Sequence, residues 1–422
     1  MRFKIVYEIG IGVFELAIWL KASFSAKVRR MLIGRTISID RIKKFRNEHP
    51  EDQVIWFHAA SVGEFEQALP VIKILKEDFP DVCIAVSFFS PSGFELRHKH
   101  PLVDVSFYLP VDRTWNASKI IKILKPKSLV LVKYEFWFNL IFTCKRLRIP
   151  VVSVCCILKN QTLEKFGASQ ILKNTLPLID HFFIQNIETS QVLRTLGLQN
   201  FSINGDTRVD RVLEIKELGA EIPWLEKWKG DSKLLIIGSA WIEDILYLRD
   251  FLKHAVVEAH GLWKVLIVPH EIDEQHLNNL THSLQLPFDL YTNWKEKEED
   301  SDILVLNTLG LLSRAYRHAE AAWIGGGFKT GLHNTLEAAV FGIPIGFGPN
   351  FEKFQEAKDL LEIGVAKSFP NSNTSVWEFF QQSTENEEEE VRIQNGAKLY
   401  FQRQKGASRS IVQFLSEKIT KE

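Results

Sequence analysis

Several charged side chains follow apolar runs of the kind that form buried strands. Glu64 comes after such a run at residues 53–59, directly behind Gly63, and begins a predicted helix. A carboxylate at this place can lie in a cleft and accept a proton from a hydroxyl group, which is the role of a general base. A glutamate in a first helical turn is also favoured by the helix dipole alone. Both interpretations of Glu64 are open at this point.

Glu135 and Arg208 hold similar positions in the sequence. Glu135 follows a strongly apolar run, where its carboxylate could anchor a ligand or pair with Lys133. Arg208 lies just after the last apolar run of the first half and could stabilise negative charge; a salt bridge with Asp206 or Asp210 is the alternative. No Ser-His-Asp order and no Cys-His arrangement stands out in the sequence.

His270 is the candidate for a phosphate contact in the second half. It directly follows Pro269 at the end of an apolar run, where a structural histidine is the usual alternative. The only Asp-x-Asp pair, Asp300 and Asp302, ends an acidic stretch that is typical of a solvated loop, so we expect no metal site. Without a metal, a leaving phosphate must be stabilised by helix N-termini and by side chains such as Arg208 and His270.

A glycine-rich stretch organises the second half of the chain. Residues 319–324 are apolar and strand-like, and four glycines follow within seven residues: Gly325, Gly326, Gly327 and Gly331. A helix is predicted to start near His333 or Asn334 and to run to Phe341. Free backbone N–H groups and the positive end of a helix can hold an anion. Glu337, about one turn into the helix, could reach a neighbouring group such as a ribose hydroxyl. The alternative is an ordinary crossover with a loose loop, and the pattern does not identify the anion.

Strands and helices alternate along the whole chain. This alternation predicts an α/β protein with parallel, doubly wound sheets, and 422 residues are too many for one ordinary core. We therefore expect two Rossmann-like domains facing a cleft, with ligands beyond the carboxyl ends of the strands. The expected divisions are an N-terminal helix and basic segment at 1–46, a first domain at 47–212, a linker at 213–231, and a second domain at 232–422 with a final helix that packs back.

Charge and cysteine content exclude some classes of function. Lys+Arg and Asp+Glu both number 52, so the bulk charge predicts no nucleic-acid partner. The four cysteines lie in apolar runs and lack the spacing of a zinc site or of a secreted disulfide framework: Cys83, Cys144, Cys155 and Cys156. We expect reduced thiols in the core of a cytosolic protein.

The N-terminus combines an apolar helix with a basic segment. Residues 9–20 are apolar except for Glu15, and they are too few to span a bilayer as a helix. Glu8 and Glu15 share one predicted helix face with Lys4, and apolar side chains occupy the other. Residues 21–46 contain nine basic side chains and one acidic side chain. The pattern suits an amphipathic helix lying on an anionic membrane, and a helix packed on the protein's own core is the alternative.

Six motifs together resemble those of the 3-deoxy-D-manno-oct-2-ulosonic acid (Kdo) transferases of Gram-negative lipopolysaccharide synthesis. They are HAASVGEFEQALP at residues 58–70, SFFSPSGFE at 87–95, KYEFWFNL at 133–140, GDTRVDRV at 205–212, VPHE at 268–271, and the glycine-rich stretch from residue 322 to residue 356. Each motif is weak alone, whereas their order and spacing over residues 1–366 are specific.

The resemblance implies a GT-B glycosyltransferase that transfers Kdo from CMP-Kdo to a lipid A precursor (lipid IVA), with inversion and without a cofactor. It also implies a location at the cytoplasmic face of the inner membrane. Glu64 would be the general base, and Glu135 and Arg208 would stabilise the transition state. CMP would be bound by Pro269, His270, Leu309, Gly310, Leu311, Asn334, Thr335, Leu336 and Glu337. Two alternatives stay open: another GT-B enzyme that uses a UDP-sugar, as a transferase or 2-epimerase, and a non-catalytic nucleotide-binding protein.

Overall fold

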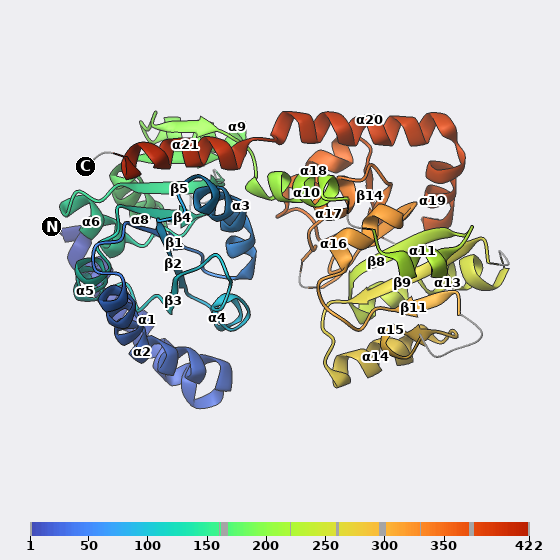
Figure 1. Cartoon of the computed structure of the whole chain (residues 1–422), viewed down its shortest axis with the longest axis horizontal. Coiled ribbons are helices and arrows are strands. Elements are labelled where there is room, and N and C mark those ends of the chain that lie inside the picture. The colour runs from blue at the N-terminus through green and yellow to red at the C-terminus, as the bar shows by residue number, and fades with distance from the viewer. Residues whose placement is uncertain are drawn as a thin grey trace. The chain divides into compact units, whose positions relative to one another are not determined.

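The computed structural model describes residues 2–159, 161, 168–219, 221–258, 261–294, 301–329, 331–370 and 375–420. Asp300 and the acidic stretch before it lie outside the described residues. The chain forms two compact units (Figure 1). The first unit comprises Met1–Asp210 and Gln404–Glu422, and the second comprises Arg211–Arg403.

The first unit is built on a seven-stranded parallel sheet in the order β3-β2-β1-β4-β5-β6-β7. Its strands are β1 (Val54–His58), β2 (Cys83–Phe88), β3 (Val105–Tyr108), β4 (Ser128–Val132), β5 (Val151–Cys156), β6 (His181–Ile184) and β7 (Phe201–Ile203). Every residue of the first five strands is buried, as expected for a sheet covered on both faces. The two faces pack into separate apolar cores.

Helices cover both faces of this sheet (Figure 1). They are α1 (Arg2–Phe24), α2 (Ala26–Glu48), α3 (Val62–Asp78), α4 (Pro91–Arg97), α5 (Thr114–Leu124), α6 (Phe138–Arg146), α8 (Ala168–Thr175), α9 (Ile187–Thr195) and α21 (Ala407–Ile419). The C-terminal helix α21 packs against α3 and adds Ile411, Val412 and Leu415 to the core of this unit. The first unit therefore takes its last helix from the far end of the chain.

The second unit repeats the architecture with a parallel sheet in the order β10-β11-β9-β8-β12-β13-β14. Its strands are β8 (Lys233–Ala240), β9 (Trp263–Pro269), β10 (Asp289–Leu290), β11 (Ile303–Val305), β12 (Ala321–Ile324), β13 (Ile345–Phe347) and β14 (Ala366–Ser368). Among the helices that cover it are α12 (Ile242–Tyr247), α14 (Glu274–Leu284), α16 (Leu312–Ala315), α17 (Leu336–Ala339), α18 (Gln355–Glu362), α19 (Val376–Glu385) and α20 (Glu387–Gln404). The predicted linker at 213–231 includes the end of α10 (Thr207–Glu217) and the whole of α11 (Pro223–Lys229).

Two helix predictions are wrong in extent. The helix after the glycine-rich loop is the single turn α17, because Phe341 and Gly342 bond back to the third residue before them and the chain then turns at Gly342 with φ +76°. The predicted final helix is two helices, α20 and α21, which are separated at Gly406 with φ +95°. A left-handed residue cannot continue an α-helix, and glycine adopts this conformation without a Cβ clash.

Candidate active site

Glu64 and Glu135 flank the point where the strand order of the first sheet reverses. Strands β1 and β4 are hydrogen-bonded neighbours, and the chain leaves them toward opposite edges of the sheet. Glu64 follows β1 and Glu135 follows β4. In doubly wound sheets this reversal opens a crevice at the carboxyl ends of the strands, which is where ligands bind.

The carboxylate of Glu64 is buried, and a residue at the start of its own helix bonds to it. Glu64 lies in the first turn of α3 and is 8% exposed. The hydroxyl of Ser61 donates a hydrogen bond to its Oε2. Burial raises the pKa of Tyr134, and the charges of Glu64 and Glu135 raise it further. Both carboxylates therefore lie close to one tyrosine.

Glu135 is held by Trp137, whose indole also contacts His58. The Nε1–H of Trp137 donates to Glu135 Oε2 at 2.9 Å and to His58 Nε2 at 3.1 Å. Since an indole can only donate, His58 accepts at Nε2 and carries its proton on Nδ1, which faces the Ser87 carbonyl at 3.1 Å. Glu135 thus takes its hydrogen bond from the indole, and no bond to Lys133, the alternative that the sequence left open, is found among the described residues.

Arg208 forms an ion pair with Asp206, which is one of the alternatives that the sequence left open. Its Nε and one terminal nitrogen lie 3.0 and 2.6 Å from Asp206 Oδ2. Burial alone would raise the pKa of Asp206, but the charges of Arg208 and Lys133 and the hydrogen bonds from Arg208 outweigh it and hold the pKa below its usual value. Gln67, one turn after Glu64 on α3, donates to both oxygens of Asp206 at 3.2 and 3.1 Å. Arg208 is thereby tied to the helix that carries Glu64.

The second sheet reverses its strand order between β8 and β12. Asp244, which the sequence did not single out, follows β8 and is completely buried. Its Oδ2 accepts from the backbone N–H groups of Trp241 at 3.0 Å and Gly326 at 3.1 Å. Its Oδ1 accepts from the indole of Trp323 at 3.1 Å. Asp244 therefore fixes the glycine-rich loop after β12 to the turn after β8.

The glycine-rich loop is tightly packed, which corrects the expectation that its first amides are free for an anion. Gly325 N–H donates to the Gly238 carbonyl at 2.9 Å, and Gly326 N–H donates to Asp244. A Cβ on Gly325 would stand 2.2 Å from the Ser239 carbonyl oxygen, and one on Gly327 would stand 2.7 Å from the backbone of Gly348. The glycines allow close approach of neighbouring backbone segments. A glycine-rich sequence is expected for this packing as well as for anion binding, so the sequence alone does not distinguish the two.

Glu337 lies among groups that suit a nucleoside. Its Oε1 accepts from Asn334 Nδ2 at 3.0 Å, and its Oε2 accepts from the Ser313 hydroxyl at 2.7 Å. The hydroxyl of Thr335 is buried and has no hydrogen-bond partner among the described residues. Ser313 belongs to α16, directly after residues 309–311, so the structure brings this predicted segment to the Asn334–Glu337 turn. Leu309 itself is 76% exposed.

His270 lies in a stack of aromatic rings rather than alone. Its ring centroid is 4.7 Å from that of Trp241 and 4.3 Å from that of His333. Burial lowers the pKa of His333 to about 4, and burial also lowers the pKa of His270. Both histidines are therefore neutral at pH 7. His270 can donate a hydrogen bond to a phosphate there, but it brings no positive charge.

The chain is similar in sequence to known proteins of one family. Residues 38–211 match the protein family described as 3-deoxy-D-manno-octulosonic-acid transferase (kdotransferase). The 3-deoxy-D-manno-octulosonic acid transferase of Chlamydophila psittaci is 27% identical over 330 residues, which cover 76% of this chain and 75% of that protein. The Aquifex aeolicus transferase is 28% identical over 310 residues, which cover 73% of this chain and 79% of that protein. The chain is a homologue of the Kdo transferases.

Solved structures of low sequence identity share the fold of this Kdo transferase homologue. UDP-GlcNAc 2-epimerase from Neisseria meningitidis, bound to UDP-GlcNAc, is 15% identical with a TM-score of 0.63, covering 86% of this chain and 100% of the epimerase. Acinetobacter baumannii MurG is 15% identical with a TM-score of 0.54, covering 86% of this chain and 99% of MurG. These matches confirm the predicted α/β fold of the GT-B type with two doubly wound parallel sheets.

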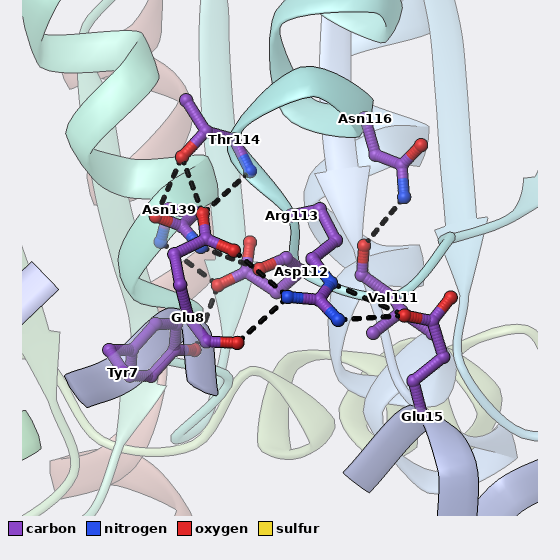
Figure 2. Close-up of polar contacts among 9 residues, drawn as sticks. All are labelled: Tyr7, Glu8, Glu15, Val111, Asp112, Arg113, Thr114, Asn116 and Asn139. Carbon is purple, nitrogen blue, oxygen red and sulfur yellow. Dashed lines mark hydrogen bonds and ion pairs between the residues drawn. The ribbon is translucent and has the colours of Figure 1, made fainter. Parts of the chain in front are cut away.

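The N-terminal helix of the Kdo transferase homologue is attached through its polar face. Arg113 binds Glu8 at 3.2 Å and Glu15 at 3.1 Å, and Glu8 also accepts from the Thr114 hydroxyl at 2.7 Å and from Asn139 Nδ2 at 3.0 Å (Figure 2).

A buried pair lies beside this network. The Tyr7 hydroxyl donates to Asp112 at 2.8 Å, and burial raises the pKa of Asp112 to about 6 (Figure 2). Tyr7 and Ile11 pack on Val111 and Phe138. Helix α1 therefore turns its acidic side inward, onto the first unit.

The apolar side of the N-terminal helices faces outward. Large apolar side chains of α1 and α2 that are exposed are Ile5, Val6, Ile9, Val13, Phe14, Leu16, Trp19, Leu20, Phe24, Ile33 and Ile37. We call this set the outer apolar face. Exposed apolar side chains that gather on one pair of helices are typical of interaction surfaces, whereas singly scattered ones are ordinary. Within the described part of the chain, no helix combines the length and the apolar character needed to cross a membrane.

Two groups of possible metal ligands lie within the described residues. Glu271 and Asp273 both bond to His276, at 2.9 and 2.6 Å, and all three are exposed. The second group is His49, Asp52 and Cys83. Cys83 begins β2, so this group lies at the edge of the sheet opposite to Glu64 and Glu135. Neither group contains a residue of the candidate active site.

Proposed function

We propose that the protein transfers Kdo from CMP-Kdo to a hydroxyl group of a lipid A precursor (lipid IVA), with inversion at the sugar carbon. The observation that carries this proposal is the pair of carboxylates, Glu64 and Glu135, at the reversal point of the first sheet of a Kdo transferase homologue. The first unit then binds the acceptor and the second unit binds the nucleotide sugar.

Glu64 is assigned as the general base. Its carboxylate takes the proton of the acceptor hydroxyl while that oxygen forms the bond to the anomeric carbon of Kdo. The bond from that carbon to the CMP phosphate breaks, and CMP leaves with the electron pair. The hydrogen bond from Ser61 orients the carboxylate, and the burial of Glu64 keeps the proton transfer away from bulk water.

Glu135 and Arg208 are assigned to the transition state. The sugar ring gains positive character as the phosphate departs, and the phosphate gains negative charge. The carboxylate of Glu135, which Trp137 fixes in place, suits the first charge, and the guanidinium of Arg208 suits the second. Asp206 limits the freedom of Arg208, so the arginine is positioned before substrate arrives.

The CMP site is assigned to the loops at the reversal point of the second sheet. Glu337 suits the ribose hydroxyls and the neutral His270 suits the phosphate, because each has donor or acceptor capacity of the right kind. The remaining proposed contacts are Pro269, Leu309, Gly310, Leu311, Asn334, Thr335 and Leu336. CMP leaves with one phosphate, so less negative charge needs neutralising than with a nucleoside diphosphate.

The outer apolar face is assigned to the lipid surface that contains the acceptor. A groove of about 430 Å³ between α1 and α2 is lined by Trp19, Leu32 and Ile33, among others. Basic side chains of α2 lie on the same pair of helices, as at many interfaces with anionic lipid. We therefore place the protein on the cytoplasmic face of the inner membrane, where lipid-linked acceptors are held.

A thermal-shift experiment separates this proposal from a UDP-sugar enzyme on the same fold. We expect CMP at about 100 times its Kd to stabilise the protein by about 2.7 kcal/mol, which raises Tm by several degrees. UDP at the same concentration should leave Tm unchanged. A shift with UDP and none with CMP would favour a UDP-sugar transferase or 2-epimerase, the activity of the Neisseria meningitidis relative in fold.

A further inference from the structure

The buried face of α2 contains a positively charged residue. Its buried side chains are Met31, Arg35, Ser38, Ile42 and Phe45. Their spacing of three and four residues places them on one face of the helix, which packs against β3 and α5. Arg35 is only 8% exposed. A guanidinium therefore stands where packing alone favours an apolar side chain.

The guanidinium of Arg35 has no hydrogen-bond acceptor among the residues that the structure describes. Nε and both terminal nitrogens are buried and unpaired. The guanidinium lies 4.7 Å from the centre of the Phe89 ring. Glu15 exerts a charge effect on it, but the Glu15 carboxylate is bonded to Arg113 at 3.1 Å. Burial lowers the pKa of Arg35 to about 10, so the side chain is still charged at neutral pH.

An aromatic ring replaces only part of the hydration that a buried guanidinium loses. Five N–H donors in a fixed plane remain without acceptors, which is unfavourable unless an anion binds. The geometry of a guanidinium matches two oxygens of a phosphate or carboxylate. An anionic group that arrives with a substrate would supply the acceptors that Arg35 lacks.

Phe89 connects Arg35 to the candidate active site. Its backbone N–H donates to the Ala60 carbonyl at 3.3 Å, one residue before Ser61, which bonds Glu64. Its ring stacks on Trp137 with 5.1 Å between the centroids, and Trp137 holds Glu135. A group bound by Arg35 would therefore lie beside Phe89, which contacts Trp137, the partner of Glu135, and the residue before Ser61, the partner of Glu64.

We propose that Arg35 binds a phosphate group of the lipid acceptor and so directs its reacting hydroxyl toward Glu64. This inference rests on the proposed function and adds the acceptor group that is recognised and the residue that recognises it. The acceptor is favoured over the donor because α2 also carries Ile33 and Ile37 of the outer apolar face. Phe14 of the outer apolar face stacks on Phe89 with 6.3 Å between the ring centroids, so acyl chains on that face would hold a phosphorylated head group near Arg35.

Steady-state kinetics with two acceptors test the assignment. One acceptor is the tetraacylated lipid A precursor with its phosphates, and the other is the same molecule with the phosphates removed. For Arg35→Gln, we expect the KM for the phosphorylated acceptor to rise at least tenfold, with an unchanged KM for CMP-Kdo. The wild type should prefer the phosphorylated acceptor, and the variant should lose this preference. Arg35→Lys should restore part of it.

Arg41→Gln is the matched control. Arg41 lies on the same helix and its guanidinium is 5.0 Å from the centre of an aromatic ring, that of Phe94. This variant should keep the wild-type preference for the phosphorylated acceptor. The control separates loss of a specific phosphate contact from loss of any arginine on this helix.

Two results would overturn the assignment. One is a raised KM for CMP-Kdo in Arg35→Gln, which would mean that the guanidinium binds the donor. The other is an equal loss with both acceptors together with a lower Tm, which would mean that Arg35 only packs on Phe89. If the wild type transfers no Kdo, the proposed function fails separately, and equilibrium binding of the two precursors to wild type and Arg35→Gln still decides the role of Arg35.

Discussion

Glu64 differs from an ordinary first-turn glutamate in its surroundings. The helix dipole favours acidic side chains at a helix start, but it gives no reason to bury them. Glu64 is 8% exposed, accepts a hydrogen bond from Ser61 and shares Tyr134 with a second carboxylate. The proposed general base would need such surroundings, and the helix dipole does not account for them.

Removing the charge of Glu64 should therefore stop catalysis without harming the fold. The amide of Glu64→Gln has the same shape and can still accept from Ser61, but it cannot take a proton. We expect kcat to fall by about 100-fold or more, which is the usual contribution of a general base. CMP binding and Tm should stay near the wild-type values. The measurements are a radiolabelled transfer assay, calorimetric titration with CMP, and thermal unfolding.

Glu66→Gln provides the matched control, since Glu66 lies two residues further along α3 and pairs with Arg97 at 2.8 Å. This variant should retain nearly full activity. Wild-type activity in Glu64→Gln, or an equal loss in both variants, would remove Glu64 from the role of base.

Sequence reasoning located the strand ends of the site but missed two of its residues. His58 is the last residue of an apolar strand, and its partner Trp137 is 79 residues away. Asp244 reads as a plain first-turn acid, and its partner Gly326 is 82 residues away. Residue type and local spacing identify groups that follow a strand. They do not reveal which distant backbone group a buried carboxylate or imidazole will bond.

At the scale of elements, the strongly apolar strands were predictable and the short elements were not. The largely apolar runs at residues 128–132 and 181–184 predict two strands, and β4 and β6 have the same bounds. β10 and β14 have two and three residues, too few for a periodic signal. The apolar segment before Gly342 predicts a helix of two turns, whereas α17 forms only one turn.

Helix α1 shows what tertiary contacts add to an ambiguous amphipathic pattern. The sequence left a membrane helix and a core helix open. Arg113 binds the acidic side of α1, and the apolar side is left outside. An ordinary core helix has the opposite arrangement. Helix α1 is thus attached to the first unit by its acidic side and leaves apolar side chains exposed to water, which is unfavourable.

We expect the triple substitution of Ile9, Val13 and Leu16 to glutamate to abolish binding to anionic lipid vesicles. These side chains are 64%, 65% and 60% exposed, so the fold should tolerate the change. Each would lose the benefit of burial in lipid, about 1.5–3 kcal/mol for a large apolar side chain, so affinity should fall by about 100-fold or more. Vesicle sedimentation measures the binding, and circular dichroism with Tm checks the fold.

The control for this triple variant is the substitution to glutamate of three exposed leucines on the second unit. They are Leu218, Leu246 and Leu262, which are 70%, 46% and 62% exposed. This variant should sediment with vesicles like the wild type. If the α1 variant still binds vesicles, or if it instead dissociates a wild-type dimer, the outer apolar face is not the lipid-binding surface.

At the scale of the whole molecule, the two units have the same architecture and place their candidate residues at the same point of it. Each has seven parallel strands, and in each the candidate residues lie at the reversal of strand order, between β1 and β4 or between β8 and β12. The chemistry differs between them. The first unit presents carboxylates and Arg208, as required for activating a hydroxyl and stabilising charge, whereas the second presents a neutral histidine stack and Glu337, as suits a nucleoside.

The central claim is that one chain with these two sites forms a glycosidic bond to a lipid-linked acceptor. The most direct measurement is incubation of the purified full-length protein with CMP-Kdo and the tetraacylated lipid A precursor, followed by mass spectrometry of the lipid product. We predict that the precursor gains the mass of one or more Kdo residues and that one CMP is released for each Kdo transferred. An unchanged lipid mass with active protein and intact CMP-Kdo would contradict the account.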